Sequence, residues 1–146
     1  MGVYAQEHQN LDYSKTLLQT VRNAKAMYEH EAIAFLGKFL FSYQTATTQT
    51  VGSLSGGERS RLQMALLMLQ APNFLLLDEP TNNLDIQSAE VLEAALNDFN
   101  GSLLVISHDR YFLDKVVDRI AELDTNQGEL TDYLGGYTDY LAAKKM

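Results

Sequence analysis

Two acidic residues directly follow an apolar run and have the chemistry of a metal and phosphate site. Residues 74–77 are Phe-Leu-Leu-Leu, typical of a buried parallel strand, and Asp78 and Glu79 come next. Adjacent carboxylates at a partly buried strand end repel each other, and a divalent cation relieves this repulsion. Asp78 is therefore a candidate Mg²⁺ ligand, and Glu79 a candidate general base that polarises water for attack on phosphorus. An acidic turn closed by Pro80 is the alternative for this segment alone.

A second apolar run, residues 102–106, ends in Ser107-His108-Asp109. If the two strands are parallel neighbours, His108 lies beside Glu79 at the carboxyl edge, where open α/β sheets bind ligands. An imidazole there would hydrogen-bond a terminal phosphate and orient the attacking water. A structural histidine is the alternative for His108 taken alone. We expect the other histidines, His8 and His30, to face solvent.

The sequence Ser55-Gly56-Gly57-Glu58 precedes a helical pattern over residues 58–70. Ser55 and Glu58 have the spacing of a capping box. Glycines in a first turn cost helix stability and leave backbone N–H groups bare, so that an anion can approach the helix N-terminus. The segment therefore fits either a capped helix start without a ligand or a phosphate site.

Alternating helices and short apolar strands from residue 52 onward predict an α/β fold with a parallel sheet covered on both faces. We predict helices over 58–70, 86–99 and 111–117, strands over 73–77 and 102–106, a hairpin of 120–123 with 129–133, and a helix after residue 136. The earlier part is predicted as a strand over 2–6, a helix capped by Asp12 or Ser14, a helix over 32–37, and a Thr/Gln-rich loop over 43–51.

Composition limits the class of protein. The chain has 146 residues, of which 46% are apolar, with no cysteine and a net charge of −8. One globular domain is the expectation for this length, and no linker indicates a second. Residues 73–146 hold 5 basic and 14 acidic residues, so independent binding to nucleic acid is not expected. Without an 18-residue apolar run or an export signal, we expect a cytoplasmic protein with no membrane segment.

Taken together, these motifs resemble those of the ATP-binding cassette (ABC) ATPases. Residues 54–58 are similar to the signature loop, residues 75–79 to the Walker B strand, and Leu84-Asp85 to the D-loop. His108 resembles the switch histidine, and Gln6 the Q-loop glutamine. The resemblance implies a partial P-loop NTPase cassette, with a mostly helical subdomain over 7–57 and the signature helix, Walker B and switch part of the core over 58–146.

The resemblance also implies a set of residue roles, with ATP and Mg²⁺ as cofactors. Glu79 and His108 would be catalytic, and Asp78 and Gln6 would hold the metal. The remaining nucleotide-binding positions would be Ser55, Gly56, Gly57 and Asp85, together with Gln6.

Further residues resemble the ABC-F branch, whose members are soluble, have two cassettes, and in many cases act on the ribosome. They are residues 78–85, 107–113 and 136–141, while residues 35–41 look more like a second cassette than a first. Asn83 stands where the branch commonly has histidine. The implied partners are a second ABC cassette and the ribosome.

The P-loop of a cassette, Gly-x-x-x-x-Gly-Lys-Ser/Thr, does not occur in these 146 residues. Phe39 follows Gly37-Lys38, and no glycine stands five positions before Gly37. The chain thus resembles the C-terminal two-thirds of a cassette, and we expect it to be inactive alone and prone to self-association through exposed strand edges. The alternatives are a fragment of a transporter ATPase subunit, or a non-enzymatic module or remnant that supplies a signature loop in trans.

Overall fold

A computed structural model describes residues 2–4 and 11–146. It comprises two compact units, one ending at Ile106 and the other running from Ser107 to Met146. Among the described residues, no helix is long and apolar enough to cross a membrane.

A parallel sheet with strand order β1-β2-β3 forms the centre of the first unit. The strands are β1 (Gly2–Tyr4), β2 (Phe74–Asp78) and β3 (Ser102–Ile106). The middle strand, β2, pairs Leu75 with Gly2 on one side and with Leu103 on the other. The predicted parallel pairing of β2 with β3 is confirmed, and Leu75 and Leu77 of β2 are fully buried.

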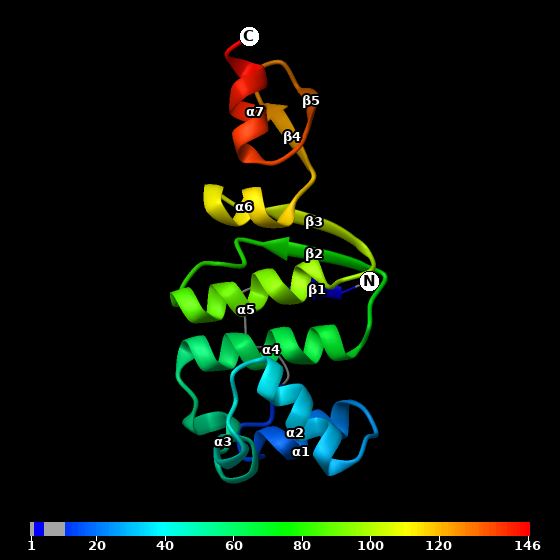
Figure 1. The fold of residues 1–146 in the computed structure, drawn as a ribbon, viewed down its shortest axis with the longest axis vertical. Helices are drawn as coiled ribbons and strands as arrows, with labels where there is room; N and C mark the ends of the chain where they lie inside the picture. The colour runs from blue at the N-terminus through cyan, green and yellow to red at the C-terminus, as the bar shows by residue number, and fades with distance from the viewer. Residues whose placement is uncertain (1, 5–10) are drawn as a thin grey trace. The chain divides into compact units, whose positions relative to one another are not determined.

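Two long helices pack beside this sheet. The bounds are Gly56–Leu69 for α4 and Ile86–Asn97 for α5, close to the predicted ones, and the two helices contact each other (Figure 1). Leu62 and Leu92 are among the apolar side chains that they bury. The prediction of a sheet covered on both faces is wrong for β3, where Leu104 remains 52% and Ile106 53% exposed.

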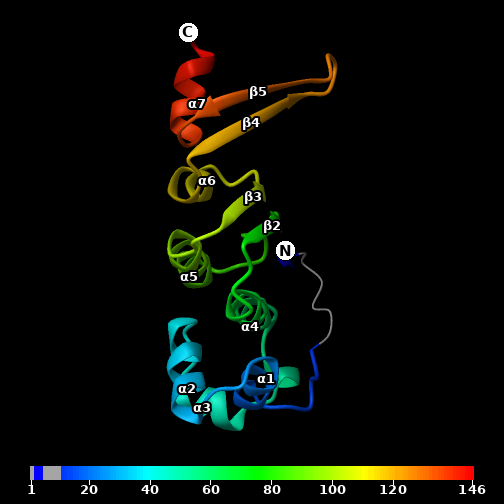
Figure 2. The same ribbon diagram turned by 90° about the vertical axis from the view of Figure 1, so that its right-hand side faces the viewer.

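The described residues between β1 and α4, from 11 to 55, form a mostly helical segment (Figure 2). It contains α1 (Leu17–Ala24), α2 (Glu29–Lys38), α3 (Tyr43–Thr48) and a 3₁₀ turn over Val51–Ser53. Helix α1 contacts α2, α3 and α4. The side chains with no exposed area in this segment are Leu17, Val21, Ala32, Leu36, Ala46 and Val51.

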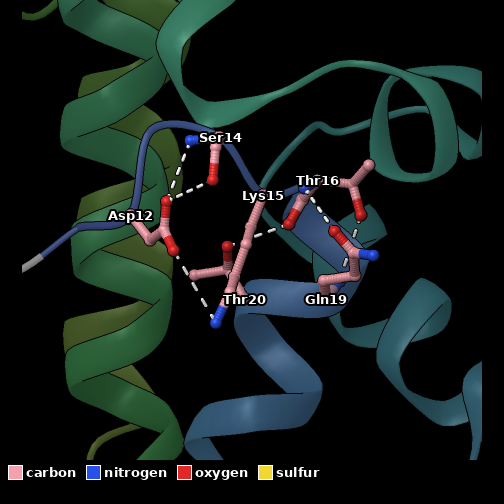
Figure 3. Close-up of polar contacts among 6 residues, drawn as sticks. All are labelled: Asp12, Ser14, Lys15, Thr16, Gln19 and Thr20. Carbon is pink, nitrogen blue, oxygen red and sulfur yellow. Dashed lines mark hydrogen bonds and ion pairs between the residues drawn. The ribbon is translucent and has the colours of Figure 1, made fainter.

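The predicted cap of α1 is wrong. Thr16 is the N-cap residue: its hydroxyl accepts the Gln19 N–H at 3.2 Å, and its own N–H donates to Gln19 Oε1 at 3.0 Å (Figure 3). Asp12 instead closes a local turn, in which Oδ1 accepts the Ser14 hydroxyl at 2.6 Å and the Ser14 N–H at 3.0 Å. These hydrogen bonds lower the pKa of Asp12 and engage the carboxylate before the helix begins.

The predicted loop over residues 43–51 is also wrong, because α3 lies within it. Ser42 caps this helix by accepting the Thr45 N–H at 3.1 Å. The Thr48 hydroxyl donates back to the Gln44 carbonyl at 2.7 Å, and Ala46 is buried. The Ser42 cap and the burial of Ala46 therefore stabilise a helix whose sequence has no apolar period.

The second unit contains two helices and one hairpin. Helix α6 spans Arg110–Val116, β4 spans Arg119–Asp124, β5 spans Glu129–Leu134, and α7 spans Tyr137–Lys144. The predicted antiparallel hairpin is confirmed, and α7 packs against both β5 and α6. Asp114 links the helices, since its carboxylate accepts the Thr138 N–H and the Thr138 hydroxyl, each at 2.7 Å.

Candidate functional site

The predicted signature segment forms the N-terminus of α4. Ser55 is the N-cap residue, and its hydroxyl accepts the Glu58 N–H at 3.2 Å. The Ser55 N–H donates in return to Glu58 Oε2 at 2.8 Å, so the predicted capping box is confirmed. Together these bonds fix the entry of the chain into the helix.

Nothing in the described structure requires glycine at the first two positions of α4. A Cβ atom at Gly56 or Gly57 would meet no atom within 4 Å, and neither residue has a positive φ. Ser55 and Gly56 are exposed, and Gly57 is half-buried. The helix therefore presents bare backbone N–H groups to open space, which is the arrangement that binds anions.

Asp78 and Glu79 stand at the carboxyl end of β2, as predicted. Asp78 is exposed and Glu79 half-buried. The Glu79 N–H donates to the Ile106 carbonyl at 2.7 Å, so backbone bonding between the two strands continues past the end of β2. Glu79 has a φ of +44°, a left-handed conformation that is unfavourable for this residue type. Such strain clusters at active sites and ligand clamps.

A tight turn connects this strand end to α5. The Asn82 N–H donates to the Glu79 carbonyl at 3.1 Å, and Asn83 has a φ of +62°, which asparagine tolerates better than most residues. Asp85 then caps α5 by accepting the Ser88 N–H at 2.7 Å. Hydrogen bonding from Ser88 lowers the pKa of this exposed carboxyl below its ordinary value.

The two remaining site candidates, His108 and Gln6, do not fall in the described part of the first unit. His108 is an exposed residue near the start of the second unit, immediately before Asp109, whose carboxylate caps α6 by accepting the Phe112 N–H at 3.1 Å. Its approach to Glu79 remains a prediction. Gln6 lies outside the described residues.

The donor set at the end of β2 fits a magnesium ion that takes most of its ligands from phosphate and water. Among residues 11–146, no group of three or more His, Asp or Glu side chains could hold a metal ion. Mg²⁺ commonly binds to one or two carboxylates plus substrate phosphates rather than in an all-protein cage. The exposed Asp78 carboxylate suits that mode, with Glu79 as its neighbour.

Sequence reasoning missed one group next to the signature segment. Arg59 places its guanidinium carbon 5.1 Å from the centre of the Tyr13 ring and donates from Nη2 to the Gly52 carbonyl at 3.0 Å. The sequence carries no signal for this contact, because Tyr13 precedes the apolar pattern of α1 and Arg59 resembles any solvated helix residue.

Comparison with known proteins decides the family. The family model described as ABC transporter matches residues 1–82, which is more than half of the chain. This chain belongs to the ABC family. Its curated relatives include the ABC transporter F family member 5 of Arabidopsis thaliana, 42% identical over 90% of this chain and 19% of that protein. The prediction of an ABC-F-type cassette is thereby confirmed.

Two further relatives are bacterial. The putative ATP-binding protein YdiF of Bacillus subtilis (strain 168) is 48% identical over 99% of this chain and 22% of its own length. The energy-dependent translational throttle protein EttA of Haemophilus influenzae is 40% identical over 93% of this chain and 25% of its own length. The chain thus spans about a fifth to a quarter of the length of these relatives.

A solved structure confirms the fold class. The dimeric post-hydrolysis state of the ATP-binding cassette MJ0796, bound to ADP and Pi, matches 82% of this ABC chain and 56% of its own chain, with a TM-score of 0.62 and 25% identity. The chain is therefore a partial P-loop NTPase cassette with mixed helices and parallel strands.

Proposed function

We propose that this chain supplies the signature loop, the Walker B strand end and the switch histidine of an ABC-F-type ATPase, in which Mg²⁺-dependent ATP hydrolysis accompanies cassette closure. The observation that carries the proposal is the N-terminus of α4. Its cap is fixed by Ser55 and Glu58, whereas Gly56 and Gly57 face open space that the described chain does not fill. A bound phosphate explains why side chains are absent there.

The acidic strand end supplies the hydrolytic groups of the proposed reaction. Asp78 holds Mg²⁺, which when bound neutralises charge on the phosphate oxygens. Glu79 accepts a proton from the attacking water, and the hydrogen bond from its backbone to Ile106 fixes the start of the turn on which it stands. In the same proposal His108 steadies the γ-phosphate, Gln6 contacts metal and water, and Asp85 couples the two nucleotide sites.

The chain alone should bind ATP weakly and hydrolyse it negligibly. Its sequence offers no Gly-x-x-x-x-Gly-Lys-Ser/Thr segment, so the amide cradle and lysine that compensate phosphate charge must come from outside these residues. The signature loop would then act in trans, over nucleotide held by the P-loop of a partner cassette. The MJ0796 structure, a cassette dimer bound to ADP and Pi, supports such an arrangement.

Titration with labelled ATP and Mg²⁺ tests this proposal. The isolated chain should show neither turnover nor micromolar affinity, whereas a P-loop-bearing ABC cassette should associate with it in an ATP-dependent manner. Glu79→Gln should keep this association and lose any ATP hydrolysis by the associated pair, and His30→Gln is a control that should change neither, because His30 is exposed and stacks on Tyr28. Micromolar ATP affinity with turnover by the chain alone would contradict the proposal.

The proposed partners are a second cassette and the ribosome, and the proposed location is the cytoplasm. The ribosome is proposed because the relative EttA is named an energy-dependent translational throttle protein. Direct binding to RNA by residues 73–146 is not proposed, because this half carries 14 acidic residues against 5 basic ones. The exposed Leu104 and Ile106 of β3 support self-association.

A non-enzymatic module is the second candidate, favoured by the combination of an intact signature segment with no P-loop sequence. Genomic DNA immediately upstream of the Met1 codon discriminates between the two. An in-frame P-loop there identifies part of an ATPase, whereas an unrelated gene supports the module. A transporter ATPase subunit is less well supported, because the matched relatives include several of the F type.

A further inference from the structure

The loop that precedes the signature segment is bound to the segment that precedes α1. Thr16 and Thr50 form an isolated antiparallel bridge. Next to it, the Val51 N–H donates to the Lys15 carbonyl at 2.9 Å, and the Gly52 N–H donates to the Tyr13 carbonyl at 3.0 Å. Segments that are far apart in the sequence are therefore paired, through their backbones, immediately before the residues that cap α4.

Arg59 covers this pairing from the second turn of α4. Its Nη2 donates to the Gly52 carbonyl at 3.0 Å, and its Nε donates to the Val51 carbonyl at 3.4 Å. Its guanidinium carbon lies 5.1 Å from the centre of the Tyr13 ring, within the range of a cation–π contact. One half-buried side chain thus contacts both paired segments from the helix that carries the signature glycines.

Gly52 allows the two segments to approach this closely. A Cβ at this position would lie 3.0 Å from the Tyr13 carbonyl oxygen and 3.4 Å from the Tyr13 Cβ. The first neighbour is a backbone atom, which moves less easily than the end of a flexible side chain. Close packing therefore favours glycine at position 52, whereas no contact favours it at Gly56 or Gly57.

We infer that Tyr13 and Arg59 are positioning residues for the signature loop: they hold residues 50–52 against residues 13–16, so that the N-terminus of α4 is presented in one orientation. We call this group the Tyr13–Arg59 latch. The inference deepens the proposed function and rests on it for the consequence at the nucleotide. Neither residue touches the nucleotide in this scheme; both act through the loop that carries Ser55.

Amide hydrogen exchange on the purified chain, without nucleotide, tests the latch. Tyr13→Leu should accelerate exchange at Val51 and Gly52 about two- to fivefold, the factor that an exposed cation–π contact contributes. Arg59→Gln should accelerate it about tenfold, because it also removes hydrogen bonds from a charged group. Exchange within β2 should not change. Tyr13→Phe should behave as the wild type, because it keeps the ring beneath Arg59.

Arg22→Gln is the matched control, since Arg22 on α1 also donates to a backbone carbonyl, that of Met27 at 3.2 Å, and has no contact with the latch. It should leave exchange at Val51 and Gly52 unchanged. Unaltered exchange at these amides in both Tyr13→Leu and Arg59→Gln would overturn the latch. An equal rise throughout β2 would also overturn it, because that pattern indicates general destabilisation.

A second measurement separates the latch from the proposed function. ATP-dependent association with a P-loop-bearing cassette should weaken about two- to fivefold in Tyr13→Leu and recover in Tyr13→Phe. Association of the wild type with no loss in Tyr13→Leu would overturn the positioning role and leave the proposed function standing. No association even of the wild type would overturn the proposed function, and the exchange result would then decide the latch by itself.

Discussion

Paired glycines stand at the start of two helices, α4 and α7, and the two pairs differ in whether packing requires glycine. At the start of α4, a Cβ on Gly56 or Gly57 would meet nothing within 4 Å. Before α7, Gly135 has a φ of +98°, and a Cβ on it would collide with the Asp139 side chain. A Cβ on Gly136 would lie 2.6 Å from Asp114 Oδ1 and 3.1 Å from Asp114 Cα.

The fold requires glycine at positions 135 and 136, and it does not require glycine at positions 56 and 57. Gly135-Gly136 lets α7 start close to α6, where Asp114 accepts the bonds from Thr138. Gly56-Gly57 weakens its helix, and no contact among the described residues requires glycine at either position. No neighbour among the described residues gives a reason for Gly56-Gly57, and the proposed phosphate at the N-terminus of α4 would supply one.

The largest effect on stability is expected from Gly136→Ala. The new Cβ would press on the side chain and Cα of Asp114, and overpacking of this kind costs about 1–3 kcal/mol. Urea unfolding, followed by hydrogen exchange within α7, measures the loss. Gly37→Ala is the matched control, because a Cβ there meets nothing within 4 Å, and it should not destabilise the chain. If Gly136→Ala is as stable as the wild type, the fold does not require glycine at this position, and the contrast with Gly56-Gly57 is wrong.

A smaller effect of opposite sign is expected from Gly57→Ala. Replacing a glycine whose conformation suits alanine should stabilise the chain by about 0.4–1 kcal/mol, through loss of unfolded-state freedom. At the same time, ATP-dependent association with a P-loop-bearing cassette should weaken, because the methyl group occupies the space of the approaching phosphate. Thermal unfolding and the association assay measure the two results. A more stable variant that still associates normally would show that this space has no ligand.

The smallest effect is expected from the pH dependence of the α6–α7 link. Hydrogen bonds from the Thr138 backbone and hydroxyl lower the pKa of Asp114 below its ordinary value of 3.8. The stabilisation is therefore complete above pH 3.8 and is lost as the pH falls through the lowered native pKa. Hydrogen exchange at the Thr138 amide, corrected for its intrinsic pH dependence, should show this loss, and Asp114→Asn should abolish the dependence. If exchange at the Thr138 amide of the wild type, after this correction, does not change as the pH falls below 3.8, Asp114 is not the group that stabilises the link.

Much of the fold was predictable because local signals agree with it. Ser55 with Glu58 predicted the start of α4, and the apolar run before Asp78 predicted a buried parallel strand with its acids at the carboxyl end. The hairpin after α6 followed from alternation around a turn. In each case the residues that specify the element lie within a few positions of one another.

The missed features depend on contacts between distant residues or on hydrogen bonds that leave no apolar pattern. Helix α3 has only Ala46 buried, and its threonines bond back to its own backbone. Thr16 rather than Asp12 caps α1, because the Asp12 carboxylate accepts both of its hydrogen bonds from Ser14. The Tyr13–Arg59 contact joins two residues that are far apart in the sequence and whose types are common on protein surfaces. The difference between the two glycine pairs depends on their spatial neighbours, which the sequence does not show.

The strand order also determines when the first unit can be completed during synthesis. The central strand takes one partner from the start of the chain, with Gly2 opposite Leu75, and the other from much later, with Ser102 opposite Phe74. Both pairings close long loops, which slows folding, whereas β4 and β5 join across a short turn. A nascent chain that has emerged only as far as α5 carries a β2 edge with unpaired backbone groups, and emergence of residues 102–106 is the step that covers this edge.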